Sequence, residues 1–166
     1  IQAAGGSGHI VLGTGPNRGT MMEGALKISE FSWQFGAAEE LEDFAHGRFR
    51  ELDRDTPLFI ISPEGPCSAK TLDLLTGCVI SGTTAVVLTD HPTDIVRKMA
   101  SYVIEMPAVH EYLTPFVYVF AFWFYGYAAK ATINALVGEA RYGLYAVDIN
   151  FETHFRVHGK KAECTK

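Results

Sequence analysis

Cysteine is scarce in this sequence. Cys67, Cys78 and Cys164 are the only three, and no two of them form a C-x-x-C pair. Disulfide frameworks need an even, patterned set of cysteines, and thiolate metal sites need closely spaced ones. We therefore expect no disulfide framework and no metal site, and no motif indicates a cofactor. A reducing cytoplasm fits this cysteine usage best.

Basic residues are also fewer than acidic ones. Lysine and arginine number 14 against 19 acidic residues, which gives a net charge of -5. Proteins that bind nucleic acids display basic patches to neutralise phosphates, so we expect no nucleic acid as the main partner. The negative net charge does not exclude a small anionic substrate, because the charge of a pocket is set by the groups that line it.

No apolar run is long enough to span a bilayer comfortably. The most apolar stretch is 115–129, PFVYVFAFWFYGYAA, and a spanning helix needs about 20 residues. The stretch predicts an aromatic helix, and we expect no membrane partner. The helix either lies in the core of one chain or also packs against a partner domain. We favour the partner, because aromatic residues are enriched at interfaces.

Strand and helix patterns alternate along the chain. Hydrophobic residues make up 48% and charged residues 20%, as in a globular protein. Apolar runs at 9–13, 58–61, 85–88 and 102–104 indicate buried strands, with helices expected at 20–35, 68–80 and 93–100. The polar stretch 36–54 is expected to be irregular. This alternation predicts an α/β fold in which a mostly parallel sheet is covered on both faces.

The predicted helix 20–35 has two contrasting ridges. Glu23, Lys27 and Glu30 line up at helical spacing as carboxylate, ammonium and carboxylate. From spacing alone, this ridge is either a solvated face held by ion pairs or a reactive site. An apolar stripe on the same helix is expected to be buried: Met21, Met22, Ala25, Leu26 and Ile28.

The same helix resembles a known family. Residues 23–33, EGALKISEFSW, are similar to the E-G-A-L-K-L-K-E-I-S-Y segment of the sugar isomerase (SIS) family. The resemblance is greatest to the second SIS domain of glucosamine-6-phosphate synthases and of fructosamine-phosphate deglycases. Residues 42–47, EDFAHG, are similar to the family's G-E-L-K-H-G, and residues 104–107, IEMP, to its I-E-M-P. The resemblance extends over about residues 9–137.

The resemblance implies a fold and a chemistry. The fold would be a three-layer αβα sandwich of the SIS type, which is flavodoxin-like. Glu30 would be the base that moves a proton between C1 and C2 of a sugar phosphate. Lys27 would stabilise the enediolate or bind substrate, and His46 would assist ring opening in the site of a neighbouring subunit. A base and a histidine near neutral pH suit such proton transfers.

The activity implied is that of a phosphosugar aldose-ketose isomerase or a ketosamine-phosphate deglycase. The alternatives are a non-catalytic sugar-phosphate-binding or regulatory SIS module, and the isomerase part of an amidotransferase. The partners implied are the sugar phosphate and a second SIS domain, or a homodimer partner. Because family members carry an earlier SIS domain and this chain starts at a strand without methionine, we expect the C-terminal SIS half of a longer protein. Its SIS domain would be 1–137, followed by a tail at 138–166.

Four further residues are candidates for substrate binding. Glu23 lies one turn before Lys27, and Asp43 stands where the family often has glutamate. Ser62 opens the turn before helix 68–80, which either binds phosphate or is a strand-to-helix turn with an N-cap. Lys160 either matches a family lysine that enters the site from the last turns or belongs to a solvated basic tail.

Overall fold

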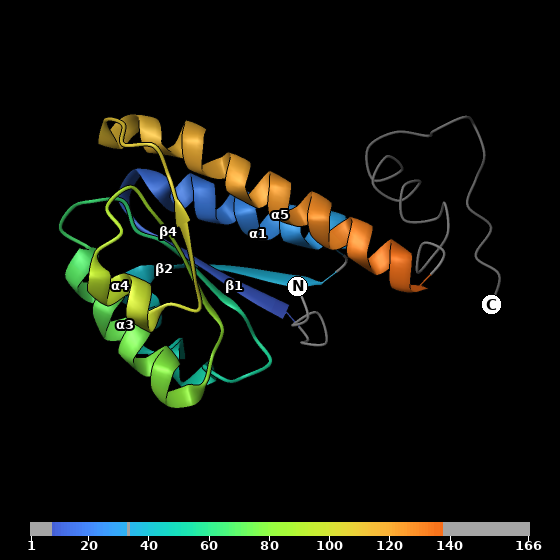
Figure 1. Ribbon diagram of the computed structural model, residues 1–166, viewed down its shortest axis with the longest axis horizontal. Helices are drawn as coiled ribbons and strands as arrows, with labels where there is room; N and C mark the ends of the chain where they lie inside the picture. Colours follow the sequence, from blue (N-terminus) through green and yellow to red (C-terminus); the bar gives the residue numbers. More distant parts are fainter. Residues whose placement is uncertain (1–7, 33, 138–166) are drawn as a thin grey trace. The chain divides into compact units, whose positions relative to one another are not determined.

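The computed structural model describes residues 8–32 and 34–137, with side chains up to residue 131. Five strands form one parallel sheet in the order β2-β1-β3-β4-β5 (Figure 1). The strands are β1 (Gly8–Gly13), β2 (Phe35–Glu40), β3 (Leu58–Ile61), β4 (Ala85–Thr89) and β5 (Tyr102–Glu105). The α-helices are α1 (Arg18–Ser32), α2 (Leu41–His46), α3 (Ser68–Ser81), α4 (Asp94–Met99) and α5 (Thr114–Val137). Short 3-10 turns are η1 (Gly15–Asn17), η2 (Arg48–Glu51) and η3 (Glu111–Leu113).

Each face of the sheet has its own helix layer and its own core. Alternate strand residues pack with α2, α3 and α4 on one face, through Leu41, Phe44, Leu75 and Val96 among others. The remaining strand residues pack with α1 and α5 on the other face, through Met21, Ile28 and Phe122 among others. Figure 1 shows α1 and α5 above the sheet and α3 and α4 below it. The predicted three-layer αβα sandwich is therefore confirmed.

The stretch 36–54 corrects the sequence prediction, because it is not irregular throughout. Residues 35–40, FGAAEE, form the edge strand β2, which pairs with β1 from Gly8↔Phe35 to Gly13↔Glu40. Glycine, alanine and glutamate are poor strand formers, so local preference does not predict this strand. It forms because β1, whose six residues are all buried, offers it a complete row of partners. The preceding helix consequently ends at Ser32, earlier than expected.

The predicted apolar stripe of α1 is also only partly right. Met21, Ala25 and Ile28 are buried, but Met22 is 63% and Leu26 is 47% exposed. The reason is the crossing with α5, which occurs at a glycine. A Cβ at Gly24 would lie 2.7 Å from the ring of Phe122. The helix therefore packs through the side that carries Gly24, and that side excludes Met22 and Leu26.

The junction of α1 and β2 depends on Gly36. A Cβ there would overlap the carbonyl oxygen of Ala25 on α1, and the Gly36 amide donates to Ser29 Oγ at 3.1 Å. Because backbone cannot yield as a flexible side chain does, we expect Gly36→Ala to lower the free energy of unfolding by about 1–3 kcal/mol. Urea denaturation measures this. Gly19→Ala on α1 is the matched control, since nothing lies within 4 Å of its added Cβ, and equal midpoints for the two variants would contradict the assignment.

Candidate active site

The charged ridge of α1 forms as its spacing predicts. Lys27 Nζ lies 2.6 Å from Glu30 Oε2 and 3.4 Å from Glu23 Oε1. Lys27 is the less exposed partner, with 21% of its side chain accessible against 38% for Glu30. The hydrogen bond with Glu30, supported by the charge of Glu23, raises the pKa of Lys27. The ridge therefore keeps an ammonium group between two carboxyl groups, whose side chains are 35% exposed at Glu23 and 38% exposed at Glu30.

Close packing with α5 fixes the position of this ridge. A Cβ at Gly126 of α5 would lie 2.8 Å from the ring of Phe31 and 3.2 Å from the carbonyl oxygen of Lys27. Together with the contact of Gly24 and Phe122, this brings the two helix backbones together beside the ridge. A rigid helix positions side chains better than a loop does.

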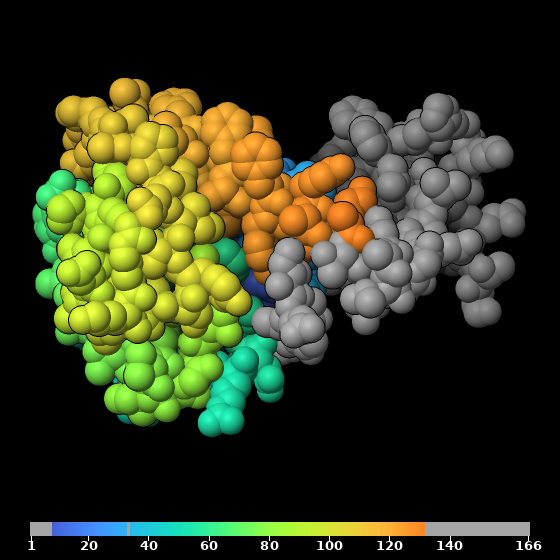
Figure 2. Space-filling view, in the orientation of Figure 1, coloured from blue at the N-terminus to red at the C-terminus, as the bar shows by residue number. Residues whose placement is uncertain are grey.

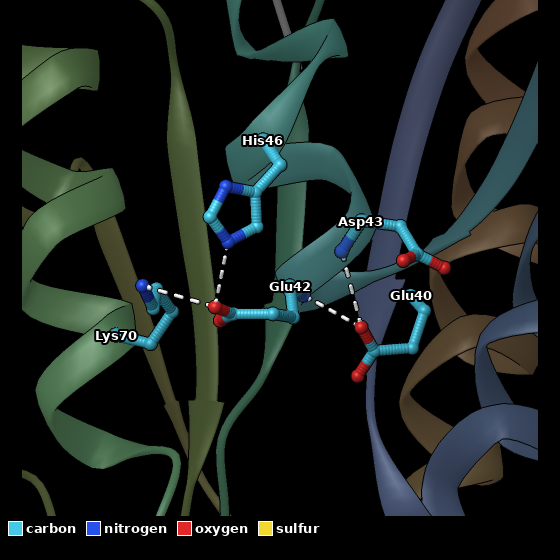
Figure 3. Close-up of polar contacts among 5 residues, drawn as sticks. All are labelled: Glu40, Glu42, Asp43, His46 and Lys70. Atoms are coloured by element: carbon cyan, nitrogen blue, oxygen red, sulfur yellow. Dashed lines mark hydrogen bonds and ion pairs between the residues drawn. The ribbon is translucent and has the colours of Figure 1, made fainter.

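His46 is the last residue of α2, and its surroundings are drawn in Figure 3. Its Nε2 lies 3.0 Å from Glu42 Oε1, and Lys70 Nζ of α3 lies 3.3 Å from the same oxygen. The hydrogen bond from His46, and then Lys70, hold the pKa of Glu42 below its ordinary value. At the start of α2, Glu40 Oε2 accepts from the amides of Glu42 and Asp43 at 2.7 and 3.2 Å. The short helix is thus capped at one end and linked to α3.

The turn after His46 is held by Arg48. Its Nη1 donates to Glu39 Oε2 of β2 at 2.8 Å. Its Nε and Nη2 donate to the two carboxylate oxygens of Glu51 at 2.9 and 2.7 Å. The bidentate ion pair with Glu51 holds the turn itself, and the bond to Glu39 ties the turn to the sheet.

Glu30 and His46 lie on opposite faces of the sheet in a single chain. Residues of α1 pack into the core shared with α5, whereas Leu41 and Phe44 of α2 pack into the core shared with α3. The structure therefore brings together Glu23, Lys27 and Glu30, and it places His46 elsewhere with Glu42 and Lys70.

The other candidate binding residues are scattered. Ser62 is buried at the end of β3, and its hydroxyl accepts from Thr71 Oγ1 at 2.9 Å. The turn that follows leads into α3 at Ser68, and no side chain caps the helix amides, so the expected N-cap is wrong. Asp43 is exposed in the first turn of α2. Lys160 lies outside the described residues.

Two residues near His46 were missed from the sequence. Glu42 lies four residues before His46, and that spacing on a helix could have identified the pair. It was missed because this part of the chain was expected to be irregular. Lys70 lies 28 residues beyond Glu42, on another helix. No local signal links these two, and only the packing of α2 beside α3 brings them together.

Comparison with known proteins places this geometry in a family. The SIS domain model matches residues 8–137. A curated relative from Methanothermobacter thermautotrophicus, glutamine--fructose-6-phosphate aminotransferase [isomerizing], is 30% identical over 114 residues, which are 68% of this chain and 19% of that protein. The chain thus spans about a fifth of the length of this relative.

Solved structures show the same fold at lower identity. The tagatose-6-phosphate ketose/aldose isomerase of Escherichia coli matches with a TM-score of 0.61 and 21% identity, over 78% of this chain and 36% of that one. The sugar isomerase domain of the RpiR transcription factor of Sphaerobacter thermophilus matches with a TM-score of 0.60 and 16% identity, over 79% and 74%. The match of the SIS domain model to residues 8–137 shows that this chain belongs to the SIS domain family.

Proposed function

We propose that the chain carries the isomerase site of a phosphosugar aldose-ketose isomerase, with Glu30 as the base that moves the proton. The observation that supports this most is the pairing on α1, where the exposed carboxyl group of Glu30 lies 2.6 Å from the Lys27 ammonium. Relatives that are named as isomerising enzymes act on sugar phosphates. Replacing Glu30 by Gln tests the proposal, since it removes the base and preserves the size of the side chain.

The proposed reaction needs one carboxylate for two neighbouring carbons. Glu30 takes the proton from the carbon beside the carbonyl group, and the electron pair of that C–H bond forms the double bond of an enediolate. The carbonyl oxygen becomes negative and lies by the Lys27 ammonium. The hydroxyl proton on the second oxygen then passes to the negative oxygen, and the electron pair left on the second oxygen forms the new carbonyl group. The electron pair of the carbon–carbon double bond takes the proton from Glu30 at the other carbon. Glu30 ends ionised as it began, so no co-reactant is needed.

Lys27 and Glu23 have supporting roles in this proposal. A permanent ammonium group lowers the energy of a developing oxyanion most when it is already in place. Lys27 meets this condition, because two carboxyl groups hold it on the helix. Glu23 orients Lys27 and contacts substrate hydroxyl groups. Asp43 and Ser62 remain proposed substrate-binding residues.

In this proposal, His46 acts in the site of a paired domain, where it opens the sugar ring. The support is topological, because the sheet separates His46 from Glu30 within one chain. An exposed aromatic surface on α5 suggests where the pairing occurs. It consists of Phe116, Phe120, Phe124 and Tyr127, with exposures between 48% and 72%. Figure 2 shows α5, coloured gold to orange, at the surface.

None of the helices in residues 8–32 and 34–137 combines the length and apolarity that crossing a membrane requires.

We expect this α5 surface to bind a second copy of the chain. Phe124→Lys should shift the protein towards the monomer, because burying an unpaired ammonium group in an aromatic contact is unfavourable. Light scattering at several concentrations measures the mass. Ile80→Lys on α3 is the control, since Ile80 is 82% exposed but lies on the opposite helix layer. An unchanged mass for Phe124→Lys would contradict the pairing.

Other activities of the family use the same groups. A ketosamine-phosphate deglycase would release an amine after the same proton transfer, and an amidotransferase would use the site for its isomerising half, as the name of the relative indicates. The alternative of a regulatory module is supported by the likeness in fold to the sugar isomerase domain of a transcription factor. Sensing requires no base, so loss of turnover with retained binding in Glu30→Gln separates an enzyme from a sensor.

A further inference from the structure

The carboxylate of Glu42 connects two helices at His46. It accepts from His46 Nε2 within α2, and it binds the Lys70 ammonium of α3 through the same oxygen, Oε1. Figure 3 shows Glu42 extended between the two partners, with the ring of His46 above it. The family segment has glycine at the position of Glu42. The contact is therefore a feature of this chain that the resemblance does not supply.

The contact decides which nitrogen of the ring carries the proton. An ionised carboxylate can only accept hydrogen bonds, and Lys70 favours that ionised form. His46 Nε2 must therefore carry a hydrogen to bind Glu42. In neutral imidazole the other nitrogen is then the acceptor, so Nδ1 has the lone pair.

The arrangement contributes little to stability. The side chains of His46 and Glu42 are 75% and 49% exposed, and water and salt screen ion pairs that are this accessible. What the contact does provide is orientation. Glu40 holds the first turn of α2, and Arg48 holds the turn after His46. With both ends fixed, a single contact to Glu42 is enough to set the direction of the ring.

We propose that Glu42, held by Lys70, is a positioning residue for His46 that keeps Nε2 protonated and presents Nδ1 to the substrate. This rests on the proposed function, in which His46 opens the sugar ring. Nδ1 takes the proton of the hydroxyl group on the anomeric carbon, and that oxygen becomes the carbonyl as the bond from the carbon to the ring oxygen breaks. The ring oxygen then takes the same proton from His46. The histidine returns to its starting form, and Glu42 stays ionised throughout.

A double-mutant cycle in the purified protein tests the proposal, with fructose 6-phosphate as the probe substrate. We expect Glu42→Gln to lower kcat about tenfold with KM changed less than about twofold, as for other residues that orient a functional histidine. Lys70→Met should lower kcat by about two- to threefold, because it removes only the second partner. In the His46→Gln background, Glu42→Gln should change kcat less than about twofold, since its effect passes through His46. Glu105→Gln is the matched control, because Glu105 is an exposed carboxylate paired with Arg97.

The outcomes separate this proposal from the proposed function. If Glu30→Gln leaves kcat intact, the isomerase assignment is wrong. Two results would refute the positioning role and leave the isomerase assignment standing, provided that Glu30→Gln abolishes turnover. In the first, Glu42→Gln leaves kcat unchanged. In the second, Glu42→Gln lowers kcat tenfold in the His46→Gln background as well.

A second measurement needs no turnover. In the 15N NMR spectrum of protein labelled at histidine, the His46 signals are assigned by their loss in His46→Gln. We expect neutral His46 to show a protonated Nε2 and an unprotonated Nδ1. In Glu42→Ala the two nitrogen shifts should move towards each other, because both tautomers are then populated. Shifts that are identical with and without the Glu42 carboxylate would overturn the proposal.

Discussion

Glu30→Gln is expected to abolish isomerisation and to leave binding of a sugar phosphate within a few fold. An amide cannot accept the proton from carbon at working pH, and general bases typically contribute about 10²–10⁴-fold to a rate. The amide keeps an oxygen that can accept from Lys27, so the ridge should remain assembled. Turnover of fructose 6-phosphate and calorimetric titration with the same compound provide the two measurements.

Glu23→Gln is the matched control for this experiment. Glu23 lies on the same ridge and also contacts Lys27, at 3.4 Å against 2.6 Å for Glu30. We expect it to raise KM more than it lowers kcat, because it orients Lys27 without taking a proton. Equal turnover of Glu30→Gln and the unmodified protein would remove Glu30 as the base. Loss of sugar-phosphate binding in Glu30→Gln would instead make Glu30 a binding residue.

Acid should destabilise the fold through His9. The ring is 2% exposed in β1, its Nε2 lies 2.7 Å from the Tyr125 hydroxyl, and its Nδ1 has no hydrogen-bond partner within the described residues. Burial lowers the pKa of His9 from 6.5 to about 4. The unfolded chain therefore binds a proton more readily than the folded protein between these two pH values. The stabilising contribution of neutral His9 is complete above pH 6.5 and is lost as the pH falls towards 4.

We expect this linkage to cost roughly 2–3 kcal/mol between pH 7.5 and 4.5, since each shifted unit of pKa corresponds to about 1.4 kcal/mol. The free energy of unfolding in urea at the two pH values measures it. His9→Gln does not titrate and can still bond to Tyr125, so its stability should fall less over the same interval. His91→Gln is the control, since it replaces an exposed histidine outside this contact, and it should follow the unmodified protein. Equal pH dependence in His9→Gln and the unmodified protein would contradict the role of His9.

The predictable parts of the fold are those that local pattern controls. β3 was predicted at its observed bounds, and α3 and β4 within one residue. The apolar runs of the two strands are continuous, and turns separate all three elements. β2 and α2 were missed. β2 consists of poor strand formers and is stabilised by its pairing with β1. α2 is a short capped helix that packs Leu41 and Phe44 into the core.

The candidate site divides in the same way. Sequence spacing was enough to place Glu23, Lys27 and Glu30 together, because one helix carries all three. The roles of these residues remain proposals that the Glu30 variant tests. The link from His46 through Glu42 to Lys70 joins two helices, and no pattern along the chain contains it.

By itself, the sequence determined the α/β class, the buried strands and the charged ridge of the first helix, since each depends on periodicity within one element. Only the tertiary structure decided that β2 is a strand, that Met22 and Leu26 stay exposed, and that Glu30 and His46 lie on opposite faces of one sheet. These features depend on contacts between residues far apart in the chain, which close packing fixes and local preference does not encode.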